Sequence, residues 1–130
     1  MTDPITNYDG GITTNPARVV TPRSVEELQE VLRDAEQYPG PVRAMGSFHS
    51  LTPCPATDGT VVRMEGMTEV IDIDTDAMTV TAEAGIQLGE LAKALRKRGF
   101  QLILSPADYL RAANATIAEL TKADLNKGPA

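Results

Sequence analysis

Several residue types that build particular functional sites are scarce in this chain. Tryptophan is absent, aromatic residues make up 4% of the 130 residues, and there is one cysteine and one histidine. The scarcity of aromatic rings argues against a surface on which nucleic-acid bases stack. A single cysteine, Cys54, cannot form an internal disulfide, so we expect a cytoplasmic protein.

Positive charge and long apolar runs are also lacking. Lysine and arginine number 12 against 18 acidic residues, which gives a formal net charge of −6. An acidic chain repels nucleic-acid phosphates, and its one basic cluster, 93–98, falls at the end of a predicted helix, where cations complement the helix dipole. No apolar run approaches the roughly 18 residues that span a bilayer, and the polar N-terminus does not resemble a signal peptide. We therefore expect neither nucleic acid nor membrane as a partner.

Hydrophobic spacing predicts alternating strands and helices in one small α+β (α/β-like) domain, with a small mixed sheet and flanking helices. Ser24 with Glu27 three residues later is typical of a helix start, and Gly99 suits the position just after a helix end. The pattern predicts helices at 25–37, at 87–98 and from about 105 onward. Strands are expected at 17–20, 42–45, 60–64, 70–74, 78–83 and 100–104, and a frayed end at 126–130.

The segment 42–50, Val-Arg-Ala-Met-Gly-Ser-Phe-His-Ser, is the best candidate for a functional site. A strand that ends in Gly46-Ser47 can bring backbone N–H groups to an anion without an intervening Cβ. Ser47 and Ser50 can add hydroxyl donors, and neutral imidazole at His49 is a nucleophile. The ordinary alternative is a turn histidine whose ring is hydrogen-bonded within the fold.

Three other groups of residues have simpler interpretations. Cys54 is expected to be a partly buried thiol. The alternating acids Asp72, Asp74 and Asp76 lack the glycine and distal glutamate of a calcium loop, so we expect a solvated hairpin face and no metal site. The carboxylates at positions 83 and 90 fall on a strand and on a helix, and no chemistry is assigned to them.

The chain resembles the FAD-linked oxidases of the vanillyl-alcohol oxidase / p-cresol methylhydroxylase (PCMH) family, above all the gulonolactone, arabinonolactone and alditol oxidases. The resemblance runs from about Ile5 to Pro106, and several pieces follow one another in the family's order. These pieces are Asn7-Tyr8, residues 18–28, residues 42–50, Asp58-Gly59-Thr60, residues 64–67, residues 70–74, residues 80–86 with 88–91, and Gly99-Phe100-Gln101-Leu102.

The resemblance implies a fold, a cofactor and a set of contacts. The fold is the first part of a PCMH-type FAD-binding domain, and the cofactor is FAD. The loop would wrap the FAD diphosphate through its backbone amides, and His49 corresponds to the histidine that many members join covalently to the flavin C8-methyl group. The residues implied to contact the cofactor are Arg43, Ala44, Met45, Gly46, Ser47, Phe48, His49, Ser50 and Gly85.

The resemblance stops after Pro106, where the family continues with a second glycine-rich flavin segment. In this chain Ala113 and Ala118 stand where glycines are expected, and no counterpart of the family's catalytic base is found. We therefore predict an FAD-binding domain at 1–105 and an unrelated helical extension at 106–130, with no catalytic residue assigned.

Two functions are consistent with this sequence. The first is the FAD-binding part of an oxidoreductase that oxidises a CH–OH group of a sugar lactone, alditol or related alcohol and is incomplete for catalysis alone. A complementing polypeptide or a homo-oligomer would then be its partner. The alternative is a non-catalytic protein-interaction module that keeps the fold without bound flavin.

Overall fold

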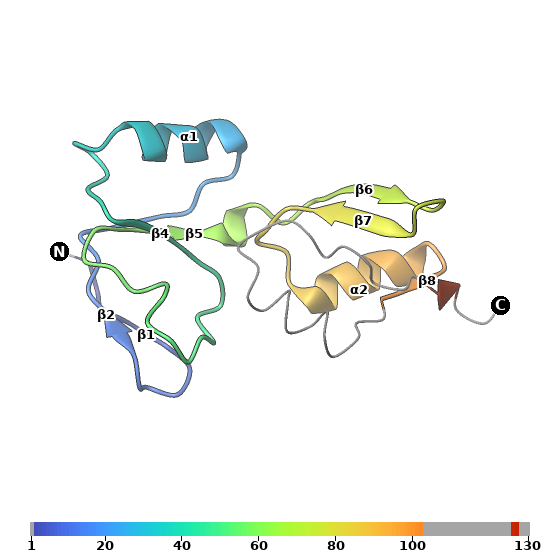
Figure 1. Ribbon diagram of the computed structural model, residues 1–130, viewed down its shortest axis with the longest axis horizontal. Helices are drawn as coiled ribbons and strands as arrows, with labels where there is room; N and C mark the ends of the chain where they lie inside the picture. Colours follow the sequence, from blue (N-terminus) through green and yellow to red (C-terminus); the bar gives the residue numbers. More distant parts are fainter. Residues whose placement is uncertain (1, 103–125, 128–130) are drawn as a thin grey trace. The chain divides into compact units, whose positions relative to one another are not determined.

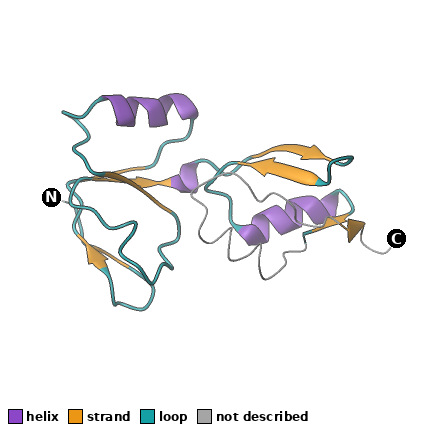
Figure 2. Cartoon of the chain, viewed as in Figure 1, coloured by secondary structure: helices purple, strands orange, loops and turns teal. Residues whose placement is uncertain are grey.

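The computed structural model describes residues 2–102 and 126–127, and the chain divides into two compact units, 1–67 and 68–130 (Figure 1). The predicted helix from 105 onward and the predicted domain boundary at 105/106 lie outside the described residues. Within these residues, parallel and antiparallel strand pairs accompany two α-helices, so the predicted α+β class is confirmed (Figure 2).

The first unit is built on a three-stranded parallel sheet. β5 (Thr60–Arg63) lies between β3 (Arg18–Val20) and β4 (Val42–Met45). Its residues Thr60, Val61 and Val62 are buried, as expected of a parallel strand that is covered on both faces. This strand order places β4 at an edge of the sheet, and the loop that follows β4 begins at that edge.

Helix α1 (Val25–Arg33) connects β3 to β4 and packs on one face of this sheet. Ser24 is its N-cap, as predicted: the backbone N–H of Glu27 donates to Ser24 Oγ at 3.2 Å. The helix ends four residues before the predicted end at Gln37. Asp34 Oδ1 accepts a hydrogen bond from the Gln37 N–H at 2.9 Å, and this local turn replaces the next helical turn.

Successive residues of β5 point to opposite faces and so divide the core of the first unit. Val62 packs with Val31 of α1, while Val61 packs with Met45 and Phe48 on the other face. That second face is also covered by the hairpin of β1 (Ile5–Thr6) and β2 (Thr13–Thr14) (Figure 1). The hairpin strands were not predicted, because two-residue strands leave almost no periodic pattern.

The second unit contains the predicted antiparallel hairpin. β6 (Val70–Asp74) pairs with β7 (Thr79–Ala82). Helix α2 (Leu88–Lys97) packs on it through Leu91 and Leu95, which are fully buried against Val80.

The end of α2 leads into a second antiparallel pair. Gly99 follows the helix with a φ of +81°, so its predicted place after the helix end is confirmed. β8 (Phe100–Gln101) pairs with β9 (Asn126–Lys127), so these last two residues are paired where a frayed end was expected. Residues 103–104 of the predicted strand lie outside the described residues.

Candidate functional site

The segment that follows β4 alternates between buried anchors and exposed groups. Met45 and Phe48 are buried against Val61, whereas Gly46, Ser47 and His49 are exposed between and beyond them. The two anchors hold the loop on the sheet face opposite α1. Gly46, Ser47 and His49 are exposed as a ligand contact requires, whereas the side chains of Met45 and Phe48, also predicted to contact the cofactor, are buried, and their contact stays a prediction.

Phe48 gives this loop its shape. Its φ is +54°, in the left-handed region, which a bulky residue occupies only when its surroundings impose it. Burial of the ring supplies one constraint, and the Phe48 carbonyl accepts a hydrogen bond from the Tyr8 N–H at 3.3 Å. The reversal at Phe48 leaves the next side chain, His49, on the surface.

The backbone of the loop is accessible. A Cβ added to Gly46 would meet no heavy atom within 4 Å, so the space above this residue is open. Among the hydrogen bonds between described residues, none uses the N–H of Gly46, Ser47 or His49. Backbone N–H groups that follow one another around a turn and remain unpaired form a concave site for an anion.

The two serines of the loop differ in their surroundings. Ser47 is exposed, and its hydroxyl makes no hydrogen bond among the described residues. Ser50 is half-buried, and its hydroxyl donates to the Thr52 carbonyl at 2.9 Å while accepting from the Thr52 N–H at 3.1 Å. Ser47 is therefore the more available donor for a ligand, because a donation from the Ser50 hydroxyl would replace its hydrogen bond to the Thr52 carbonyl.

The N-terminal hairpin supports the loop from the same sheet face. Asn7 is buried, donates from Nδ2 to the Ser50 carbonyl at 3.0 Å, and accepts at Oδ1 from the Ile12 N–H at 2.9 Å. The Tyr8 ring meets the His49 ring edge-on, with 5.4 Å between ring centroids. In the sequence, Asn7-Tyr8 marks only the start of the family resemblance, and no local pattern indicates that these residues belong to the site.

The remaining predicted contacts are dispersed. Arg43 and Ala44 are exposed on β4, which precedes the loop directly. Gly85 lies in the other unit, in the turn before α2, and its contact with a cofactor stays a prediction.

The carboxylates of Glu83 and Glu90 have separate partners: Glu83 accepts from the Glu69 N–H at 2.8 Å, and Glu90 pairs with Lys93 at 2.6 Å.

Two predictions about residues outside the loop have opposite outcomes. Cys54 is exposed, so the predicted partly buried thiol is wrong; it stands between Pro53 and Pro55 in a connection whose residues 51–54 are all exposed. The solvated face at Asp72, Asp74 and Asp76 is confirmed, because all three are exposed. Asp74 Oδ1 accepts from the backbone N–H groups of the hairpin turn, at residues 76 and 77.

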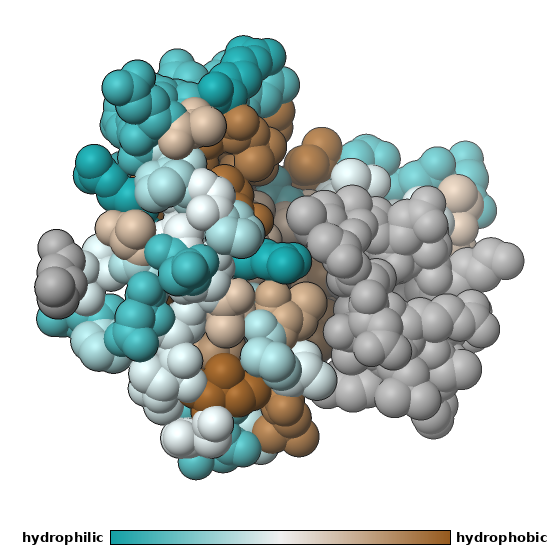
Figure 3. Space-filling view, turned by 60° about the vertical axis from the view of Figure 1, so that its left-hand side comes forward, coloured by the Kyte–Doolittle hydropathy of each residue, from teal (hydrophilic) through white to brown (hydrophobic). Residues whose placement is uncertain are grey.

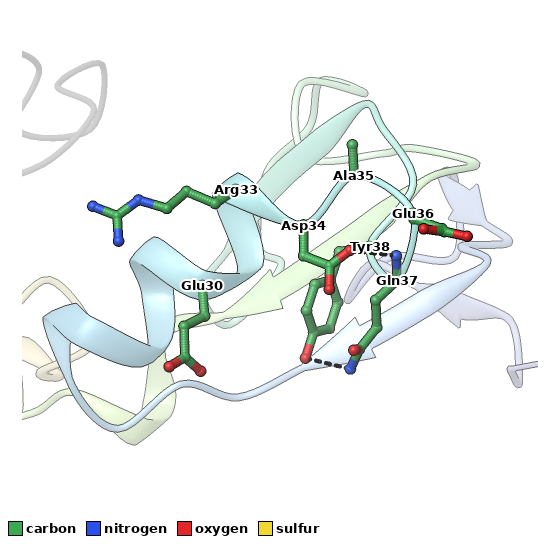
Figure 4. A pocket seen from close by; sticks show the side chains of 7 residues that line it. All are labelled: Glu30, Arg33, Asp34, Ala35, Glu36, Gln37 and Tyr38. Carbon is green, nitrogen blue, oxygen red and sulfur yellow. Dashed lines mark hydrogen bonds between the residues drawn. The ribbon is translucent and has the colours of Figure 1, made fainter.

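A surface hollow of about 630 Å³ lies at the C-terminal end of α1 and shares no residue with the loop (Figure 4). Its lining is mostly polar, and Gln37 Nε2 donates to the Tyr38 hydroxyl at 2.9 Å across it. The lining residues are Glu30, Arg33, Asp34, Ala35, Glu36, Gln37 and Tyr38. This hollow holds no histidine, and its lining has three acidic side chains against one arginine, which disfavours an anion, so the loop after β4 remains the candidate site.

Two further observations on the described residues concern membrane-spanning helices and metal-binding groups. Residues 2–102 and 126–127 contain no helix long and apolar enough to cross a membrane. They also hold no group of three or more histidine, cysteine or acidic side chains placed to bind a metal ion.

Comparison with known proteins gives a consistent set of matches. Residues 16–117 match the family described as FAD binding domain. L-gulono-1,4-lactone dehydrogenase of Mycobacterium tuberculosis is 37% identical over 92 residues, which are 71% of this chain and 22% of that protein. L-gulonolactone oxidase of Bos taurus is 40% identical over 67% of this chain and 20% of its own length. Alditol oxidase of a Streptomyces species is 30% identical over 78% of this chain and 24% of its own length.

Solved structures share the fold. An alkyldihydroxyacetonephosphate synthase superposes with a TM-score of 0.60 at 26% identity, over 70% of this chain and 19% of that chain. Cholesterol oxidase from B. sterolicum superposes with a TM-score of 0.63 at 18% identity, over 80% of this chain and 21% of its own, a likeness of fold alone. The chain thus spans about a fifth of the length of the relatives that it matches.

Proposed function

Because this chain belongs to the FAD-binding domain family, for which FAD is the cofactor, we propose that it forms part of an oxidoreductase acting on sugar lactones, alditols or related alcohols. The family match confirms the resemblance predicted from the sequence. The names of the relatives, a lactone dehydrogenase, a lactone oxidase and an alditol oxidase, support this substrate class. When bound, the flavin supplies the acceptor for a hydride from a CH–OH carbon.

The observation that carries this proposal is the backbone of the loop: the space above Gly46 is open, and no hydrogen bond between described residues uses the N–H of Gly46, Ser47 or His49. A diphosphate needs several donors at close range and no side chain in the way, and this loop meets both requirements. In the proposed site the three N–H groups bind the diphosphate of FAD, and the Ser47 hydroxyl adds a fourth donor. Met45 and Phe48 hold the loop in place by their burial.

We propose His49 as the residue of covalent attachment. It is the only histidine of the chain, it is exposed, and it directly follows the left-handed residue Phe48. Attachment would replace the imidazole N–H and one C–H of the flavin C8-methyl group by a C–N bond, while the released hydrogens and electrons reduce the flavin ring. An exposed imidazole next to the diphosphate site has the access that this bond requires.

We further propose that a complementing polypeptide supplies the remaining flavin and substrate contacts. The aligned part of this chain covers 22% and 24% of two of the relatives, and a half-site leaves much of the flavin in water. Hydrophobic surface is visible among the hydrophilic residues in Figure 3. Large apolar side chains that are exposed and available for such a contact are Tyr8, Val25, Leu32, Leu51, Ile71 and Leu88. The expected cytoplasmic location stays a prediction.

The proposal is tested by titrating the ¹⁵N-labelled chain with FAD, ADP and riboflavin and following backbone amide signals by NMR. FAD and ADP, which carry the diphosphate, should shift the signals of Gly46, Ser47 and His49. Riboflavin, which lacks it, should shift them far less. Signals of Glu30 and Gln37 in the α1 hollow serve as the internal control and should stay unchanged. Shifts confined to the hollow, or no response to FAD, would overturn the proposed site and favour the flavin-free interaction module.

Covalent attachment needs a separate measurement. The chain is incubated aerobically with FAD and denatured, and the flavin absorbance retained on the protein is compared between the original chain and His49→Ala. Asp72→Asn, on the exposed β6–β7 hairpin, is the matched control. Loss of retained flavin in His49→Ala alone supports attachment at His49. FAD binding without any retained flavin in the original chain contradicts attachment and leaves the diphosphate site standing.

A further inference from the structure

The hairpin formed by β1 and β2 contacts the His49 loop more closely than its short strands suggest. Ile5 and Ile12 pack on the core that contains Met45 and Phe48. Between them lies a tight reversal, in which the Asn7 N–H donates to the Ile12 carbonyl at 2.9 Å and the Gly10 N–H donates to the Asn7 carbonyl at 3.1 Å. The hairpin tip therefore has a defined conformation where it meets the loop.

Two consecutive residues of this tip contact three consecutive residues of the loop. Asn7 Nδ2 donates to the Ser50 carbonyl at 3.0 Å, and the Tyr8 N–H donates to the Phe48 carbonyl at 3.3 Å. His49, which lies between these two carbonyls in the sequence, has its backbone flanked by both hydrogen bonds. The loop is thus tied to the hairpin immediately before and immediately after the histidine.

The ring of Tyr8 provides a third contact, and core packing does not account for it. Its side chain is 65% exposed, yet the ring meets the imidazole of His49 at 5.4 Å between centroids with an interplanar angle of 64°. This edge-to-face arrangement is a favoured geometry for aromatic pairs. It restricts rotation of an exposed imidazole that would otherwise sample several orientations in water.

We infer that Tyr8 is a positioning residue for His49, fixing the plane of the imidazole that faces the flavin, while Asn7 holds the hairpin against the loop. The hairpin contacts show how Tyr8 holds the imidazole, and the role of the imidazole in flavin attachment rests on the proposed function. The loop and the hairpin then have different roles: the loop amides determine how tightly FAD binds, and Tyr8 determines how fast His49 reacts. Loss of the Tyr8 ring should therefore slow attachment and leave FAD affinity nearly unchanged.

The single histidine makes this inference measurable without any ligand, because the imidazole protons of His49 give the only histidine signals in the spectrum. In the original chain we expect nuclear Overhauser contacts between those protons and the Tyr8 ring protons. Tyr8→Phe keeps the ring and should keep the ring-current shift of the His49 signals. Tyr8→Leu should move them to the values of a free histidine. The absence of Overhauser contacts in the original chain, or identical His49 signals in all three proteins, would overturn the inference.

Attachment kinetics provide the functional test. With FAD, Tyr8→Leu should lower the initial rate of covalent flavin retention several-fold, and Tyr8→Phe should restore most of it. Amide shifts of Gly46 and Ser47 on FAD titration should be alike in the three proteins. Equal attachment rates with intact amide shifts contradict the positioning role alone. Loss of the amide shifts in the original chain contradicts the proposed FAD site instead, so the two failures are distinguishable.

Discussion

The side-chain amide of Asn7 donates to the backbone carbonyl of Ser50 at 3.0 Å, across 43 residues of sequence. Asn7 is buried, and its other amide atom, Oδ1, accepts from the Ile12 N–H. One side chain therefore satisfies two backbone groups that would otherwise lie unpaired near the edge of the core. The donor half of this amide is the part that joins the hairpin to the candidate site.

Asn7→Asp removes the donor of this side chain and keeps its acceptor. The substitution keeps the acceptor toward Ile12 but places a carboxylate oxygen against the Ser50 carbonyl. At neutral pH we expect a loss of about 1–3 kcal/mol in the free energy of unfolding, because the half-buried Ser50 carbonyl loses its donor and faces a negative charge. Asn15→Asp, the same change at an exposed position, is the control and should have little effect. Urea denaturation of both variants measures the difference.

The loss in Asn7→Asp should depend on pH. Burial and the facing carbonyl raise the pKa of the introduced carboxyl in the folded protein above its unfolded value. The folded state then binds more protons, so the stability of the variant relative to the original chain is greatest below the unfolded pKa, near 4. It falls as the pH rises through the folded value. A destabilisation that is constant from pH 4 to pH 8 would show that the carboxyl is not held at the Ser50 carbonyl.

Gly59→Ala should destabilise the first unit by steric overlap. A Cβ at Gly59 would lie 2.4 Å from the carbonyl carbon of Gly40 and 2.6 Å from its oxygen, and backbone atoms cannot move aside cheaply. Overpacking of this kind costs about 1–3 kcal/mol. Gly40→Ala is the matched control, because a Cβ there meets nothing within 4 Å. Equal stabilities of the two variants in urea would show that the chain relaxes around Gly59.

Ser24→Ala removes the N-cap of α1. Its Oγ accepts from the Glu27 N–H at 3.2 Å, and no other side chain of the described residues caps that N–H. We expect a loss of about 0.5–2 kcal/mol in stability, whereas Ser24→Asp keeps an acceptor and should remain close to the original chain. Thermal unfolding followed by circular dichroism checks both. If Ser24→Asp is as unstable as Ser24→Ala, the capping hydrogen bond is not the source of the effect.

Leu91→Ala should be among the most damaging substitutions in the second unit. Leu91 is fully buried in the contact of α2 with the β6–β7 hairpin, and truncating a buried leucine costs about 2–5 kcal/mol. Leu88→Ala changes the same residue type in the same helix at a position that is 44% exposed, and should cost about 1 kcal/mol or less. Similar losses from both substitutions would contradict the described packing of α2.

Local patterns were sufficient for much of the fold. The capping serine, the alternation in β6 and β7 and the apolar spacing of α2 each lie within a few residues, so each element was predicted near its observed bounds. The end of α1 was predicted at Gln37 instead of Arg33, because the competing hydrogen bond of Asp34 depends on side-chain geometry rather than on periodicity. The exposure of Cys54 was also missed, because the burial of a loop residue depends on what packs over it.

For the site, the sequence by itself determined the chemistry at hand: a glycine, two serines and a lone histidine directly after a strand, in the order of pieces that the family shares. Only the tertiary structure decided that β5 lies between β3 and β4, that the loop occupies the face opposite α1, and that Asn7 and Tyr8 hold it there. The physical reason is the separation in sequence over which each kind of interaction acts. Caps, turns and periodicity act between residues a few positions apart, whereas strand order and the hydrogen bond from Asn7 to Ser50 depend on which distant segments bury their apolar faces together.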